Sequence, residues 1–293
     1  MLYRIGAGWT ASVGQMEQSL ERSRFVACRP TQEKSTGWIP PRGERHGALV
    51  ESVGGQLLLE YAIEDKLLPA SVVRRIAAQK LEEVEASSGR KPGRKEARDM
   101  REKVRDELLP RAFTRQATVK VWIDPRDRLL VIDTTTQARL DEVLQGLVRS
   151  LDGFALAPLK TESSPQAAMA AWLLENEAPG AFDLDRECEL KGTDDMQASV
   201  RYARHHLDMP EIRRHVEGGK MPTRLALTWE GKVGFVLTDA MQVKKIRFLD
   251  GEFRDAGTAE EDRFDADATI ATGELRGMFA GLLKALGGEA REA

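Results

Sequence analysis

The sequence is poor in cysteine and has no long hydrophobic run. Its two cysteines, Cys28 and Cys188, have neither metal-ligand nor redox-pair spacing, which favours a reducing compartment inside the cell. No run of about eighteen apolar residues occurs, so no membrane-spanning helix is predicted. The N-terminal "MLYRIGAGWTASV" lacks the apolar core of a secretory signal. We therefore expect a cytoplasmic protein with no membrane partner.

Motifs for nucleotide chemistry are also missing. No G-x-x-x-x-G-K-[ST] sequence occurs, which argues against an ATP-driven motor. The segment "GAGWTA" at 6–11 matches part of a dinucleotide-binding pattern, but no acidic residue ends a second strand about twenty positions later. No serine or cysteine motif accompanies the histidine pair His205–His206. The sequence therefore predicts no cofactor and no catalytic residues.

Carboxylates are plentiful, so a metal site has to be considered. The segment "RFDADATIATGE" supplies three of them: Asp265, Asp267 and Glu274. Its simpler interpretation is a strand entering a helix, with Thr272 at the N-cap and Glu274 near the positive end of the helix dipole. A loose E-x-K pattern occurs at both 189–191 and 64–66, as chance allows in a chain this charged. We predict no metal site.

The net charge of −3 conceals an uneven distribution. Residues 70–120 contain 14 lysines and arginines against 8 acidic residues, and residues 201–250 contain 10 against 6. Residues 251–293 contain 5 against 10. A polyanion needs only a local positive surface, so the slightly acidic whole neither supports nor excludes nucleic acid.

Apolar periodicity predicts an α+β fold of antiparallel hairpins with packed helices. Alternation of Val119, Val121 and Ile123 with polar residues predicts a hairpin over 117–135. A second hairpin is predicted over 223–238 and a further strand over 243–251. Helices are predicted over 14–25, 71–86, 94–110, 137–151, 210–220 and 273–288.

The chain divides into three predicted regions. Residues 1–157 form a first α+β region that contains the helical segment 70–110. Residues 158–250 form a second α+β region with a projecting tip near 200–210. Residues 251–293 form an acidic, outward-facing helical segment.

The stretch "RKEARDMREKVRDELLPRAFTR" at 94–115 concentrates positive charge on one helical face. At about 100° per residue, its arginines form a narrow stripe, made up of Arg94, Arg98, Arg101 and Arg105. A separate face carries Ala97, Met100, Val104 and Leu108. The stripe predicts contact with phosphates or with another subunit. The alternative is a solvated helix with pairs such as Arg98–Glu102.

A second basic run, "ASVRYARHHLDMP" at 198–210, precedes a predicted helix. It contains Arg201, Tyr202, Arg204, His205 and His206. Such a run fits a projecting tip that touches phosphates and base edges. A solvated loop is the alternative.

Several short motifs, in order along the chain, resemble the recombination-associated protein RdgC family. They are "GWIPP" at 37–41, "LLPRAF" at 108–113, "WID" at 122–124, "LALTW" at 225–229 and the closing segment that begins "RFDADATIATGEL" at 263. Each motif is weak alone, but their order and the total length make the combination specific. The resemblance covers almost the whole chain and is poorest at "AGWTASV".

The resemblance implies a DNA-binding protein rather than an enzyme. It implies an elongated, curved subunit that forms a ring-shaped homodimer around double-stranded DNA. The expected DNA binding has no sequence specificity and is weaker for single strands. The expected role is to restrain the RecA recombinase at the nucleoid. It places Phe113, with Arg111 beside it, at a subunit contact. It places Arg204 and His205 at a DNA-contacting fingertip, where the family has a lysine and a glutamine; the positive charge is kept at the first position, and an imidazole replaces the amide at the second. Core packing is the alternative for Phe113.

Two other functional classes remain open. One is a metal-dependent nuclease or other DNA-processing enzyme acting through Asp265 or Asp267. The other is a regulator that binds the recombinase and never DNA, so that inhibition would survive loss of Arg204.

Overall fold

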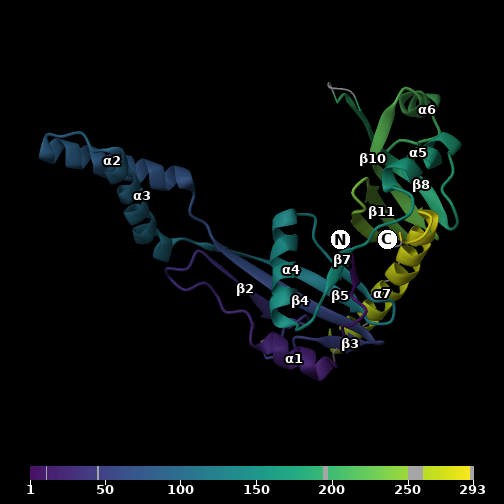
Figure 1. Cartoon of the computed structure of the whole chain (residues 1–293), viewed down its shortest axis with the longest axis horizontal. Helices are drawn as coiled ribbons and strands as arrows, with labels where there is room; N and C mark the ends of the chain where they lie inside the picture. Colours follow the sequence, from purple (N-terminus) through teal and green to yellow (C-terminus); the bar gives the residue numbers. More distant parts are fainter. Residues whose placement is uncertain (11, 45, 194–196, 250–259, 291–293) are drawn as a thin grey trace.

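The chain is an elongated, bent molecule with a helical arm at one end and a second sheet at the other (Figure 1). The computed structural model describes residues 1–290 except 11, 45, 194–196 and 250–259. Every pair of neighbouring strands in its two sheets is antiparallel. The fold is therefore α+β, as the sequence predicts. Among the described residues, no helix is long and apolar enough to cross a membrane.

The first sheet occupies the middle of the subunit. Its order is β2-β4-β5-β6-β1-β7, with β3 paired to β4. The strands are β1 (Leu2–Ile5), β2 (Lys34–Ile39), β3 (Glu51–Val53), β4 (Gln56–Lys66), β5 (Thr114–Asp124), β6 (Leu129–Ile132) and β7 (Leu156–Pro158). Helix α1 (Val13–Glu21) buries Met16 and Leu20 in the core of this sheet. In α4 (Gln137–Ser150), Gly146 lets the helix backbone approach Tyr61, because an added Cβ would lie 2.7 Å from its ring. The predicted 117–135 hairpin is β5–β6.

The arm extends from the far ends of β4 and β5, which pair from Leu57↔Ile123 to Lys66↔Thr114 (Figure 1). It consists of α2 (Ala70–Ser88) and α3 (Arg94–Leu108), followed by the short helix η1 (Leu109–Arg111). Gly89 ends α2 in the left-handed conformation, with φ +68°. A small core of Val73, Ala77 and Val104 holds the two helices together.

The second sheet lies at the opposite end of the subunit from the arm (Figure 1). Its order is β12-β11-β10-β8-β9. The strands are β8 (Phe182–Gly192), β9 (Ser199–Ala203), β10 (Lys220–Trp229), β11 (Val233–Thr238) and β12 (Val243–Phe248). Helices α5 (Pro165–Glu175) and α6 (Pro210–Glu217) pack against β10. The predicted 223–238 hairpin is β10–β11, and the predicted further strand is β12.

Helix α7 (Glu260–Ala285) joins the two sheets. Its buried Met278, Phe279 and Leu282 belong to a core that also contains Trp122 of the first sheet and Trp229 of the second. The Trp122 and Phe279 rings stack with centroids 6.2 Å apart. The C-terminal segment, predicted to be acidic and outward-facing, thus also contributes a buried apolar face to the core.

The prediction of a strand before Thr272 is also wrong. The chain from Glu260 to Ala285 is one helix, and Thr272 lies in its middle rather than at an N-cap. The Thr272 hydroxyl donates to the Ala268 carbonyl at 2.7 Å, so the side chain is satisfied within the helix. Burial of the apolar face against both sheets outweighs the weak helix propensity of the local sequence.

Candidate nucleic-acid interface

The arginine stripe of α3 lies on the outside of the arm. Arg94, Arg98, Arg101 and Arg105 are all exposed. A separate, adjacent face of the helix buries Val104 completely and Met100 and Leu108 in part. The separation of charged and apolar faces is therefore as the sequence predicts.

Neighbouring groups hold three of the four arginines. Arg98 Nε donates to Glu102 at 3.2 Å, the predicted pair one turn apart. Arg101 Nε donates to the Ala97 carbonyl at 3.0 Å, and Arg105 forms an ion pair with Glu33, which precedes β2. Exposed ion pairs contribute only about 0–1 kcal/mol. An arriving phosphate can therefore compete for these guanidinium groups at small cost.

The second basic run begins on β9, at the edge of the second sheet. Arg201 pairs with Glu187 of β8 at 3.0 Å, and Lys245 of β12 donates to the same carboxylate at 2.8 Å. The hydrogen bond from Lys245, reinforced by Arg201, lowers the pKa of Glu187. Arg201 is thus partly neutralised by a carboxylate on the neighbouring strand.

Arg204 and His205 lie beyond the end of β9, in the connection to α6. Arg204 has φ +56°, a left-handed conformation that is unfavourable for a residue with a Cβ. The His205 backbone N–H donates to Arg186 O at 3.2 Å, and buried Leu207 anchors the segment. The side chains of Arg204, His205 and His206 remain exposed.

This connection is not the turn of the β8–β9 hairpin. That turn lies between Gly192 and Ser199, at the other end of β9, and 194–196 are outside the described residues. The predicted tip near 200–210 therefore corresponds to the β9–α6 connection. Arg204 lies far from the hairpin turn because β9 pairs with β8 from Ser199 to Ala203. The turn precedes Ser199, and Arg204 follows the opposite end of the strand.

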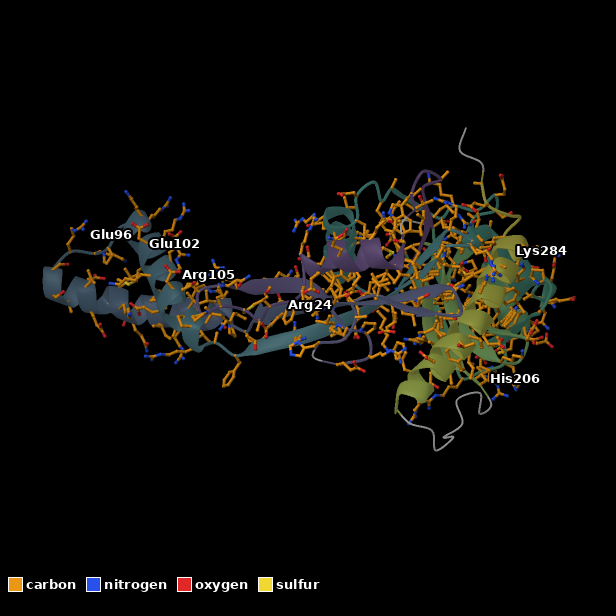
Figure 2. All side chains as sticks on the ribbon, turned by 90° about the horizontal axis from the view of Figure 1, so that it is seen from below. Arg24, Glu96, Glu102, Arg105, His206 and Lys284 are labelled. Carbon is orange, nitrogen blue, oxygen red and sulfur yellow. The ribbon has the colours of Figure 1, made fainter. Side chains whose placement is uncertain are left out.

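The two basic surfaces lie at opposite ends of one subunit. Figure 2 shows Arg105 on the arm and His206 beside the second sheet, with the first sheet between them. The structure therefore does not bring the predicted DNA-contacting residues together within a single chain. A single ligand that touched both surfaces of one chain would have to span the first sheet.

Phe113 lies at the root of the arm, between η1 and β5. Its side chain is 83% exposed, the largest value among the large apolar side chains described. Its carbonyl accepts a hydrogen bond of 2.7 Å from the backbone of Leu67, which is itself 44% exposed. Arg111 is exposed as well. Core packing within the subunit is excluded as the role of Phe113.

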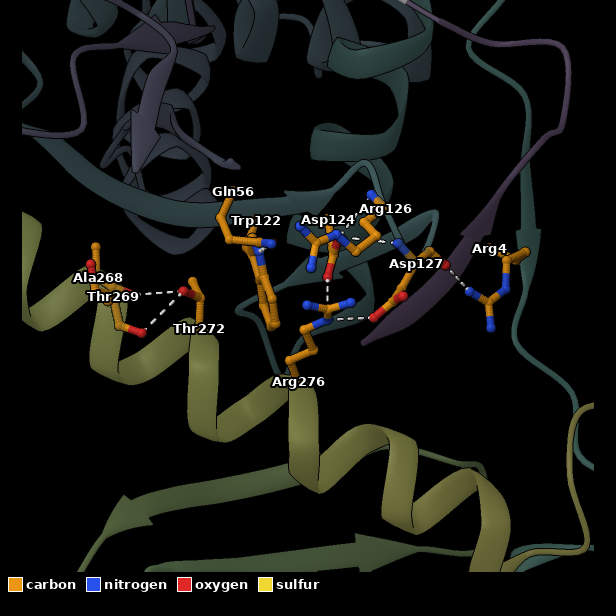
Figure 3. A network of polar contacts seen from close by, with 10 residues as sticks. All are labelled: Arg4, Gln56, Trp122, Asp124, Arg126, Asp127, Ala268, Thr269, Thr272 and Arg276. Atoms are coloured by element: carbon orange, nitrogen blue, oxygen red, sulfur yellow. Dashed lines mark hydrogen bonds and ion pairs between the residues drawn. The ribbon is translucent and has the colours of Figure 1, made fainter. Parts of the chain in front are cut away.

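A network that the sequence did not reveal fixes α7 to the first sheet (Figure 3). Asp124 accepts hydrogen bonds from the backbone of Arg126 at 2.9 Å and of Asp127 at 3.1 Å, closing the β5–β6 turn. Arg276 of α7 donates to Asp127 at 2.5 Å. That hydrogen bond lowers the pKa of Asp127. The only signal in the sequence was the turn segment "DPRD", which does not identify its partner on α7.

The carboxylates considered for a metal site are engaged elsewhere. Asp265 pairs with Arg42 at 2.6 Å, Asp267 lies 3.8 Å from Arg263, and Glu274 pairs with Lys232 at 3.3 Å. Within the described part of the chain, no three His, Cys, Asp or Glu side chains are arranged to hold a metal ion. These three carboxylates of α7 therefore form ion pairs with basic side chains.

The described chain is a two-sheet α+β protein with two exposed basic surfaces and an exposed aromatic side chain. The sequence model described as "Putative exonuclease, RdgC" matches residues 1–289. The chain is 43% identical to the recombination-associated protein RdgC of Dechloromonas aromatica, covering 100% of this chain and 97% of that protein. The corresponding protein of Cupriavidus pinatubonensis is 45% identical, covering 98% and 97%. The chain belongs to the RdgC family, a family of recombination-associated proteins.

Proposed function

We propose that this protein binds double-stranded DNA without sequence specificity, as a homodimeric ring that encircles the duplex. In this proposal the ring lies on nucleoid DNA and restrains RecA-mediated recombination as a passive barrier. It has no catalytic step. The observation that carries the proposal is the separation of two exposed basic surfaces by the length of the subunit, together with the exposed Phe113.

The elongated shape supports a ring. A two-fold assembly of two bent subunits needs two separate contacts, each formed by the same surfaces of both chains. Phe113 and Leu67 give an apolar surface for one contact, of the kind that is buried at interface centres. Closing the ring would let the basic surfaces of both subunits line one opening.

The distribution of charge supports binding to phosphates rather than to bases. Arg94 to Arg105 covers about 16 Å of helix, enough to follow several phosphates. Arg204 adds a cation at the end of the subunit opposite the arm. Such contacts release counterions and fix position, but they do not read sequence.

The first experiment measures binding to a random-sequence duplex by fluorescence anisotropy over a salt series. We expect submicromolar, sequence-indifferent affinity that falls log-linearly with salt. Arg204→Ala should make the slope shallower by about 0.9 for each phosphate that the variant no longer neutralises. Arg22→Ala, at the exposed end of α1, is the charge-matched control and should leave the slope unchanged.

Absence of binding at low salt would refute the DNA proposal. If DNA binding failed while RecA inhibition persisted in Arg204→Ala, the protein would be a regulator that acts on the recombinase alone. If Arg204→Ala bound with the wild-type slope, the β9–α6 connection would not contact phosphates.

A nuclease is the second candidate, because the description of the matching family model includes exonuclease activity. It predicts magnesium-dependent release of nucleotides from duplex ends, abolished by Asp265→Asn or Asp267→Asn. Since both aspartates lie in ion pairs with arginines, we expect no such activity. Mg²⁺-dependent cleavage by wild type that both variants lack would replace the barrier proposal by an enzymatic one.

A further inference from the structure

A cavity of about 670 Å³ lies where the first sheet meets α7 and β12. Its walls come from both halves of the molecule. They include Leu58 and Val131 from the first sheet, Ile246 from β12, and Ala271 and Leu275 from α7. Sites for small molecules typically measure about 300–1,000 Å³ and often lie between domains. The size and position of this cavity therefore suit a small ligand.

The apolar walls of the cavity are incompletely covered by the protein itself. Leu58, Val131, Ile246 and Leu275 pack against the shared core, yet each is only partly buried. Trp122, whose ring stacks on Phe279, forms part of the lining beside α7 (Figure 3). Apolar walls of this kind interact poorly with water and favour an apolar occupant.

Cations gather at the polar edge of the cavity. Lys120 of β5 and Lys244 of β12 line it, and in the described part of the chain neither has an ion-pair partner. Lys245 also lines it, but is committed to Glu187 at 2.8 Å. Of the two carboxylates in the lining, Asp267 lies 3.8 Å from Arg263, while Asp133 lies near the N-terminal amino group, whose pKa burial lowers to about 6. Two ammonium groups are thus available to an anion.

We propose that this cavity binds an amphipathic carboxylate: a free small molecule with an aliphatic or aromatic body and one anionic head. The body lies against Leu58, Val131 and Ile246, where it covers apolar surface. The head lies beside Lys120 and Lys244, where its charge is compensated. Because the walls come from the first sheet, β12 and α7, an occupant braces the two halves of the subunit. The inference does not depend on DNA binding.

The test uses the full chain with two probes, 8-anilinonaphthalene-1-sulfonate and decanoate below its micellar concentration. We expect saturable fluorescence enhancement at one site per chain and displacement of the dye by decanoate. Lys120→Ala/Lys244→Ala should weaken decanoate binding at least tenfold and leave binding of uncharged decanol unchanged. Lys284→Ala, on the exposed last turn of α7, is the matched control and should bind both as wild type does.

A cavity-filling variant locates the site. Ala271→Phe should abolish dye and decanoate binding, and its thermal unfolding profile shows whether the fold is intact. Binding that survives in a folded Ala271→Phe protein would overturn the proposal, as would the absence of saturable binding by wild type. If Ala271→Phe does not fold, the lysine variants decide: equal loss of decanoate and decanol binding, or loss of neither, would overturn it.

Discussion

The Arg276 guanidinium of α7 lies 3.2 Å from the carboxylate of Asp124, whose side chain is completely buried at the end of β5. The hydrogen bond of Arg276 Nε is made to Asp127 at 2.5 Å, so Asp124 receives charge compensation rather than a linear hydrogen bond from it. Arg4 of β1 adds a contact to the Asp127 carbonyl (Figure 3). Arg4 also pairs with Glu289, which lies beyond α7. Two parts of the chain about 150 residues apart are thereby fastened together.

Arg276→Ala should lower the free energy of unfolding by about 3 kcal/mol, because it leaves the buried Asp124 carboxylate without its counterion. Urea denaturation at neutral pH measures the loss. Asp124→Asn in the Arg276→Ala background should recover part of it, since the uncompensated charge is then absent. Lys284→Ala on the same helix is the control, with a change within about 0.5 kcal/mol. Equal losses in the control and Arg276→Ala would argue against the ion pair.

Phe113→Ala should weaken the proposed subunit contact and leave folding stability nearly unchanged, because the ring is 83% exposed within the subunit. Sedimentation should show a larger monomer fraction, and release from closed circular DNA should become faster while the initial rate of DNA binding changes little. Val148→Ala, at another exposed apolar position with 59% exposure, is the control. An unchanged release rate from circular DNA would contradict a role for Phe113 in closing the ring.

Neutralising the α3 stripe distinguishes phosphate contact from subunit contact. Replacing Arg94, Arg98, Arg101 and Arg105 by glutamine should reduce the salt slope of DNA binding by about 0.9 for each phosphate that these arginines neutralise, with the dimer intact. If the stripe instead forms ion pairs between subunits, the same change should raise the monomer fraction and leave the slope per dimer unchanged. Sedimentation and anisotropy on one preparation separate the outcomes.

Glu187 should contribute stability that depends on pH. The hydrogen bond from Lys245 lowers its folded-state pKa below the ordinary value of about 4.3. A depressed pKa gives stability that is present above the unfolded-state pKa and is lost as pH falls toward the folded-state pKa. Glu187→Gln should therefore be less stable than wild type at neutral pH, and the gap should narrow below about pH 4. Urea denaturation midpoints of wild type and Glu187→Gln, taken at neutral pH and below about pH 4, measure this stability gap. Glu85→Gln, at an exposed position on α2, is the control.

Much of the local structure follows from periodicity in the sequence. The alternation around Val121 specified β5, and the spacing of Val104 with Met100 and Leu108 specified the inward face of α3. Such patterns work because a strand or helix that buries one face must repeat its apolar residues at its own period. The same arithmetic separated the arginine stripe from that apolar face. Strand β8 and helix α5 were not predicted; α5 is apolar nearly all round, so no single face stands out.

The sequence by itself determined the α+β class, the two helices that form the arm with an arginine stripe on one face of the second, and, through ordered motifs, the family. Tertiary structure alone decided that α7 is one helix between two sheets, that Asp124 pairs with Arg276, and that Arg105 and His206 lie at opposite ends (Figure 2). The reason is physical. A repeat specifies which face of an element is buried, but its partner depends on how distant elements pack, and that is set by complementary surfaces rather than by local spacing.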